Sequence, residues 1–93
     1  METERVIGVG NYRKEDYEDI RRISMDKEAF FDTWEEWKIE QNKVKQNFIN
    51  QGFNAIDVLV KPLELEIYCG QRGLEINAKS RAEYVKSIVD NTE

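Results

Sequence analysis

The segment DKEAFFDTWEEWKIEQNKVKQNFINQG (residues 26–52) decides the fold that this sequence predicts. Asp26 is the expected N-cap, since a short acidic side chain can accept hydrogen bonds from the first free N–H groups of a helix. Gly52 can adopt the left-handed conformation in which many helices end. The segment therefore predicts one long central helix over about residues 26–51, roughly 38 Å in length at 1.5 Å per residue.

Aromatic and apolar side chains recur every three or four residues along this helix. At about 100° per residue they fall within an arc of about 60°. Such a stripe is typical of the core face of a packed helix or of a seam between two helices. We expect both tryptophans to lie in the core or in a dimer interface; an aromatic platform for a ligand is the alternative. The stripe consists of Phe30, Trp34, Trp37, Gln41, Val44 and Phe48.

Four carboxylates spaced four residues apart are expected to form an acidic ridge roughly opposite the stripe. They are Glu28, Asp32, Glu36 and Glu40. Like charges at this spacing cost about 0.2–0.5 kcal/mol per pair, so the pattern is locally unfavourable. Three interpretations are open: a solvated surface, a binding surface for a basic partner, and a divalent-ion site. The last is the weakest, because hard cations want six or more oxygen ligands from converging elements.

The remaining segments predict two short strands and further helices. β-Branched residues indicate strands at 5–12 and 53–60. A helix is expected at 13–24, and another from Pro62 to a glycine cap at Gly73. The last helix begins either with a capping box of Ser80 and Glu83 or at Asn77.

These elements describe a helix-dominated α+β fold in a single domain, residues 1–93, with the order β-α-α-β-α-α. A two-stranded sheet is marginal in water unless helices cover it or more strands extend it. The sequence does not say whether the two strands pair within one chain. We therefore expect either helical cover or completion of the sheet in a homodimer.

Composition narrows the possible functions. The net charge is −5, so no basic face for nucleic acid is expected. The chain has no histidine, the usual general base and the commonest zinc ligand, and its single cysteine, Cys69, is expected to be buried. No apolar run approaches the roughly 20 residues of a membrane span, and the first residues do not resemble a signal peptide. The sequence thus predicts a cytoplasmic protein with no cofactor, metal site or catalytic residues.

Positive charge is concentrated in the C-terminal third of the chain, at Arg72, Lys79 and Arg81. Beside the free N–H groups of a helix start, such residues can hold a phosphate or a carboxylate. Alternatively, Arg72 and Arg81 can pair with the acidic ridge of the same or a neighbouring chain. Ordinary ion pairs around a capped helix are the simplest interpretation.

Several stretches resemble a group of small bacterial proteins of about this size with no assigned function. They are NYRKEDYEDIRRISMD (11–26), DTWEEW (32–37) and YCGQRGLEINAKSRAEYV (68–85), together with the glycine before the second strand. The resemblance covers nearly the whole chain. It implies a cytoplasmic bacterial protein, and no activity or catalytic residue can be carried over from it.

Two main functional hypotheses follow. The first is a non-enzymatic interaction or regulatory module, which binds a second copy or a protein with a basic surface through the long helix and its acidic ridge. The second is a regulator that binds a small anionic ligand with Arg72, Lys79 and Arg81. An enzyme is the third and weakest, because the candidate acids, tyrosines and thiol are scattered along the chain.

Overall fold

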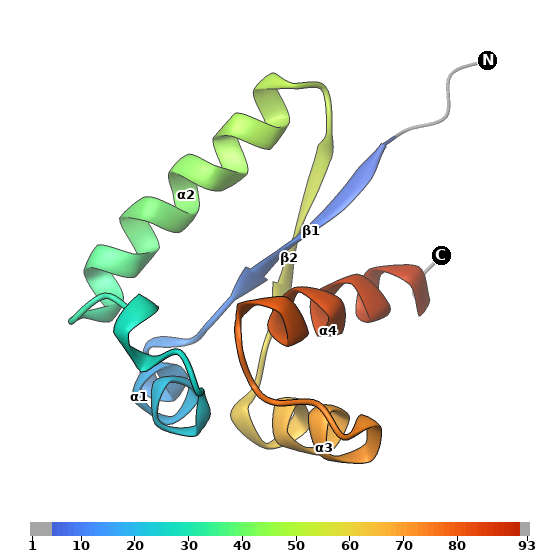
Figure 1. Cartoon of the computed structure of the whole chain (residues 1–93). Coiled ribbons are helices and arrows are strands. Elements are labelled where there is room, and N and C mark those ends of the chain that lie inside the picture. Colours follow the sequence, from blue (N-terminus) through green and yellow to red (C-terminus); the bar gives the residue numbers. More distant parts are fainter. Residues whose placement is uncertain (1–4, 92–93) are drawn as a thin grey trace.

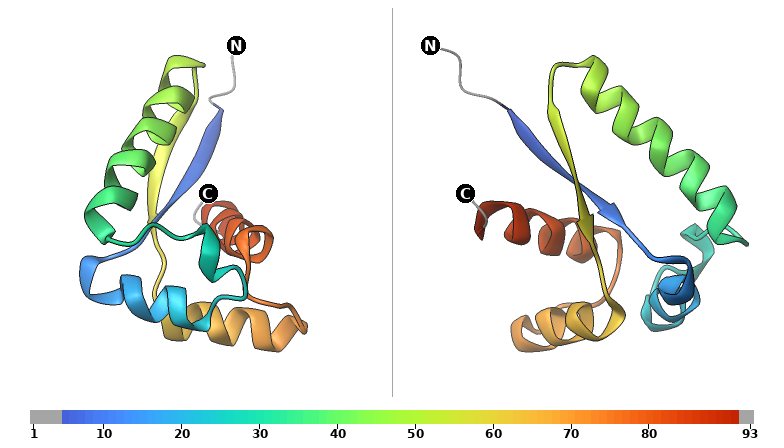
Figure 2. Two further views of the ribbon diagram at one scale, coloured as in Figure 1. Left: turned by 60° about the vertical axis from the view of Figure 1, so that its left-hand side comes forward. Right: turned by 180° about the vertical axis from the view of Figure 1, so that it is seen from behind.

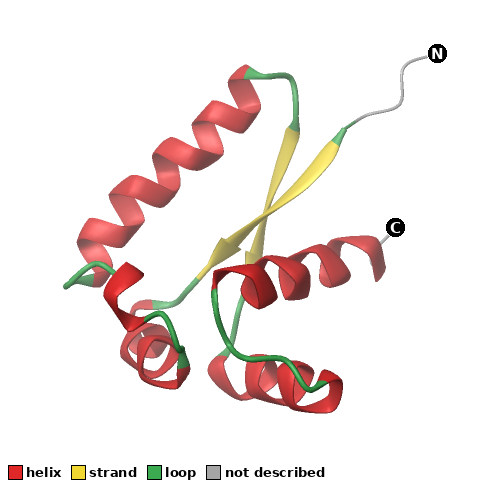
Figure 3. Ribbon diagram, viewed as in Figure 1, coloured by secondary structure: helices red, strands yellow, loops and turns green. Residues whose placement is uncertain are grey.

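The computed structural model describes residues 5–91. Its element order confirms the predicted β-α-α-β-α-α arrangement, with one additional short 3₁₀ helix, η1 (Figures 1 and 3). The elements are β1 (Val6–Asn11), α1 (Lys14–Ile23), η1 (Lys27–Ala29), α2 (Trp34–Asn50), β2 (Asn54–Leu59), α3 (Pro62–Arg72) and α4 (Ala78–Asn91).

The two strands pair with each other in parallel within the one chain. Their register runs from Val6 opposite Asn54 to Asn11 opposite Leu59. Parallel neighbours need a long crossover connection, and here α1, η1 and α2 supply it. The pairing question that the sequence left open is thereby answered.

Helices lie on both faces of this small sheet. On one face, Lys38 and Lys45 of α2 contact Asn11 and Asp57 at 3.2 and 2.9 Å. On the other face, α4 packs against β1 so closely that a Cβ on Gly8 would lie 2.6 and 2.7 Å from methyl groups of Val89 and Val85. Only a glycine permits this approach. Figure 1 shows the strands between α2 and α4.

The core lies on the α4 side of the sheet and extends toward the ends of the strands. There α1 and α3 lie next to each other, as the two views of Figure 2 show. Cys69 is buried in this core, as the sequence predicted. The buried cluster consists of Ile20, Val58, Val60, Leu65, Cys69, Tyr84, Val85 and Val89.

The predicted start of the long helix at Asp26 is wrong. Helix α2 begins at Trp34, with Thr33 as its N-cap: the Thr33 hydroxyl accepts a hydrogen bond from the N–H of Glu36 at 3.2 Å and donates one to its carboxylate at 3.0 Å. The Asp26 carboxylate binds Arg81 and makes no capping hydrogen bond to η1. Residues 26–33 therefore form η1 and a loop instead of two further helical turns.

The other predicted helix ends agree with the structure in part. Gly52 and Gly73 both have positive φ angles, 94° and 64°, and Pro62 is in the first turn of α3. Helix α4 starts after Asn77, the second of the two predicted starts. Ser80 and Asn77 bond each other's backbone N–H groups at 2.9 and 3.0 Å, so the predicted Ser80 and Glu83 box is wrong.

Candidate functional site

The candidate site is the outer edge of β1. The backbone N–H of Asn54 donates to the carbonyl of Arg5 at 2.7 Å, and that of Val60 donates to the carbonyl of Asn11 at 2.9 Å. In a parallel ladder the N–H and C=O groups of alternate residues point to the same side. Since Arg5 and Asn11 face β2, the even-numbered residues of β1 direct their backbone groups away from β2.

Helix α2 closes one end of this edge with two side chains. The amide of Gln41 donates to the carbonyl of Gly10 at 2.5 Å, and the indole of Trp34 donates to the carbonyl of Tyr12 at 2.7 Å. For the backbone groups of Val6 and Gly8 and the N–H of Gly10, no other element within residues 5–91 provides a hydrogen-bond partner. Within the described residues, this part of β1 is therefore a sheet edge without a neighbouring strand.

The open edge lies in a groove with a volume of about 530 Å³. One wall is the part of the aromatic and apolar stripe that runs from Trp37 to Phe48 on α2. The other wall is the face of α4 that includes two alanines and two valines. Figure 1 shows β1 between these two helices. The groove is bordered by β1 with Tyr12, by Trp37, Gln41, Val44 and Phe48 of α2, and by Ala78, Arg81, Ala82, Val85, Lys86, Val89 and Asp90 of α4.

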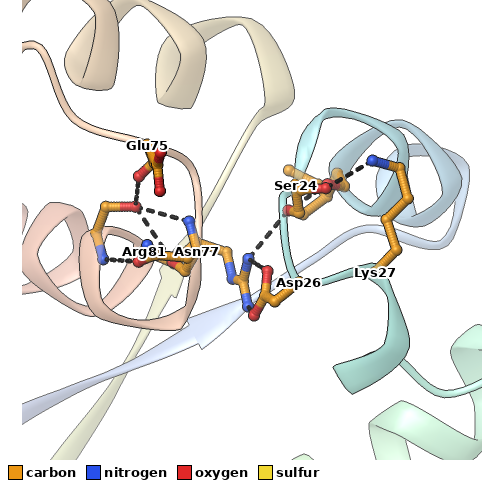
Figure 4. Close-up of polar contacts among 8 residues, drawn as sticks. Ser24, Asp26, Lys27, Glu75, Asn77 and Arg81 are labelled. Carbon is orange, nitrogen blue, oxygen red and sulfur yellow. Dashed lines mark hydrogen bonds and ion pairs between the residues drawn. The ribbon is translucent and has the colours of Figure 1, made fainter.

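Two cations reach the groove, and both are paired. Arg81 makes a bidentate ion pair with Asp26 at 2.8 and 2.7 Å and donates to the Ser24 hydroxyl at 3.0 Å, as Figure 4 shows. The Arg81 and Asp26 side chains are only 11% and 20% exposed. Lys86 lies 3.5 Å from Asp90. The groove therefore offers little net charge to an occupant.

The electrostatics of the Arg81 pair follow from its geometry. Its hydrogen bonds to Asp26 hold the pKa of that carboxyl below its ordinary value of 3.8. The guanidinium also lies over the ring of Phe30, 4.8 Å from its centroid. Burial raises the pKa of the neighbouring Tyr12 phenol. Arg81 thus stays charged while its hydrogen-bonding fork is directed inward, away from solvent.

Aromatic rings form the closed end of the groove. The Tyr12 ring stacks on Trp37 with centroids 4.8 Å apart, and Tyr17 and Phe30 lie within 6.4 Å of Tyr12. Trp37 is 8% exposed and Trp34 is half-buried. The prediction that both tryptophans belong mainly to the core is confirmed for Trp37 and in part for Trp34.

The predicted acidic ridge does not exist as one face of a helix. Glu28 lies in η1 and Asp32 in the following loop, so only Glu36 and Glu40 share α2. All four side chains are exposed, and Glu40 pairs with Lys43 at 3.1 Å. The ridge is wrong as a geometric prediction because Thr33, not Asp26, starts the helix. A role for these carboxylates in binding stays a prediction.

The three predicted basic residues also have separate surroundings. Arg72 lies over the Tyr68 ring at 3.9 Å and donates to the Tyr68 carbonyl, Lys79 is exposed on α4, and Arg81 points toward Asp26. The predicted pairing of Arg81 with the ridge is wrong, since its partner is Asp26. An anion at Arg81 would have to compete with a carboxylate already bound at two points.

Sequence reasoning missed the β1 edge, although two signals for it were present. The segment GVG (8–10) matches no nucleotide-binding motif, but its first glycine, Gly8, is what the close packing of α4 requires. Gln41 interrupts an otherwise apolar stripe, and a polar residue there indicates a backbone group in need of a partner. The Asp26 and Arg81 pair joins residues 55 apart in sequence and has no local signal.

Among residues 5–91, no three His, Cys, Asp or Glu side chains are grouped so as to hold a metal ion. Within the same range, every helix is too short or too polar to cross a membrane. No family model matches this chain, and no curated protein or solved structure matches it either. The site must therefore be interpreted from its own geometry.

Proposed function

We propose that this protein is an interaction module that binds an extended segment of a partner protein along the outer edge of β1. The observation that carries this proposal is the open edge from Val6 to Gly10, which lies at the base of a groove between two apolar helical walls. An unpaired sheet edge is a ready template for an added strand. We therefore propose the groove, rather than the predicted acidic positions, as the binding face.

The shape of the groove favours a single strand over a folded domain. No residue of β1 is exposed, because α2 and α4 cover it from both faces. A strand that already has helices of its own on its faces would collide with these walls. The occupant is therefore an extended segment with no helices packed on its faces, as in peptides that add a strand to a sheet.

The residues that line the groove determine which side chains the bound segment can carry. Successive residues of a strand point to opposite faces, so alternate side chains would meet Val44 and Phe48 on α2 and Ala82 and Val85 on α4. Both walls are mainly apolar and both cations are already paired, so charged side chains would lose hydration and gain little in return. We expect an uncharged, apolar segment of about five residues, rich in valine and isoleucine, as in strands covered on both faces.

Selection of random peptides displayed on phage tests this proposal. Peptides enriched on the full chain are expected to share an uncharged apolar run. Their binding, followed by the intrinsic tryptophan fluorescence of the protein, should weaken at least tenfold in Val44→Lys, because a lysine there extends into the groove. The matched control is Ile39→Lys, since Ile39 is 58% exposed on α2 and does not border the groove.

Equal binding by the Val44→Lys and Ile39→Lys variants would contradict the proposal. So would enrichment of basic peptides whose binding is lost when Glu36 and Glu40 are replaced by glutamine. That second result would instead support the predicted acidic surface as the binding face.

A further inference from the structure

We infer that the other edge of the sheet, β2, pairs with β2 of a second copy of this chain, antiparallel and centred on Ile56. The inference does not depend on the proposed function, because it concerns the opposite edge of the sheet. It would give a four-stranded sheet in the dimer and leave both β1 grooves open.

The backbone of β2 has an unpaired edge. Asn54 and Val60 direct their N–H groups toward β1, so the alternation of a parallel strand turns the groups of Ala55, Asp57 and Leu59 outward. For these outward groups, the part of the chain that the structure describes supplies no hydrogen-bond partner. A strand placed beside β2 would find a full set of donors and acceptors.

This edge differs from that of β1 in being open on both faces. Ile56, whose side chain is on the α4 face, and Leu59, on the α2 face, are each 41% exposed, and Asn54 and Asp57 are also exposed. Side chains on both faces of β2 are therefore accessible to a second folded copy. Exposed apolar side chains on an unpaired edge are unfavourable in a monomer and are removed from water in a dimer.

Two-fold symmetry selects the register. With the axis at Ile56, that side chain meets the same residue of the second copy, and Leu59 lies opposite Phe53. Asp57 lies opposite the small side chain of Ala55. A register centred on Asp57 would instead place two carboxylates directly opposite each other, which is unfavourable.

The charges along β2 allow a second copy of this acidic chain to approach. The net charge of −5 makes most approaches of two copies repulsive. Along β2, however, Lys45 binds the Asp57 carboxylate at 2.9 Å, so this edge is locally neutral. In the proposed register the Asp57 of the other copy lies opposite Ala55, on the same face of the sheet as Lys45, so unlike charges from the two copies share this face.

Sedimentation equilibrium of the full chain tests this inference. The wild-type protein is expected to have a mass twice the 11.0 kDa of one chain. Ile56→Lys should return it to one chain, with an unchanged far-UV circular dichroism spectrum, because two lysines would face each other at the axis. Leu59→Lys is the second variant if the first fails to fold. The control is Ile39→Lys, the same substitution at another exposed isoleucine, on α2, and this variant should remain a dimer.

Two outcomes would overturn the inference. One is a wild-type mass of 11.0 kDa at all concentrations up to about 1 mM, where even a dimer with a dissociation constant of about 1 mM would be visible. The other is a dimer that survives both substitutions on β2. Loss of the dimer in Val44→Lys but not in Ile56→Lys would likewise contradict it and would assign the contact to the β1 groove.

Discussion

At the scale of single residues, Arg81 connects segments that are far apart in sequence. Its guanidinium binds Asp26 and Ser24 and lies over Phe30, so it holds the loop before α2 against the start of α4. A planar group with a fork of donors is suited to such a bidentate contact, and lysine would not replace it. This contact shapes the closed end of the groove.

Asp26→Asn is expected to lower the free energy of unfolding by about 3 kcal/mol at neutral pH, because it leaves the buried Arg81 charge without its partner. Chemical denaturation measures the change. Glu28→Gln is the matched control, since Glu28 is exposed in the neighbouring η1 and should alter stability by less than about 0.5 kcal/mol. Equal effects of the two substitutions would show that the ion pair contributes little.

The stability difference between wild type and the Asp26→Asn variant should also depend on pH in a defined direction. Because the folded-state pKa of Asp26 lies below its ordinary value of 3.8, the pair stabilises the fold fully above that pH. The contribution is lost as the pH falls from about 4 through the lowered pKa. The stability difference between wild type and Asp26→Asn should therefore be constant near neutral pH and shrink below about pH 4. A difference that grows on acidification would contradict the assignment.

At the scale of elements, the contact between α4 and β1 depends on Gly8. An alanine there would place its methyl group 2.6 Å from Val89, so the helix or the strand must move. Gly8→Ala should cost about 1–3 kcal/mol by overpacking. Gly70→Ala is the control: nothing lies within 4 Å of its added methyl group on α3, and it should stabilise the protein by up to about 1 kcal/mol. Thermal unfolding that ranks the two substitutions in the opposite order would contradict this packing.

A comparison of the predicted with the observed elements shows which parts of the fold can be predicted from the sequence. Strand and helix order, the glycine caps and the buried Cys69 follow from local patterns, and they were predicted correctly. The start of α2 was not: Thr33 caps this helix, and the Asp26 carboxylate instead binds Arg81, a contact that depends on the tertiary fold. The groove was missed for the same reason, since its walls are α2 and α4 and no local pattern brings these helices together across β1.

In the whole molecule, the parallel sheet formed by residues 5–91 has two strands and therefore two edges, which differ in how the helices cover them. The β1 edge is covered from both faces and borders the groove, whereas the β2 edge is exposed on both faces. One edge therefore suits an extended segment and the other a second folded copy. A dimer formed through β2 would present two grooves and bind two segments.

Amide hydrogen exchange, measured by NMR on the full chain with and without a peptide selected by display, tests whether an extended segment pairs with the outer edge of β1. Strand addition predicts that exchange of the Gly8 and Gly10 amides, and of Val6 beside them, slows at least tenfold when the peptide binds, because their N–H groups gain partners. The amides of α2 beyond the groove should change little. A peptide that binds tightly while Gly8 and Gly10 exchange at their original rates would contradict the account.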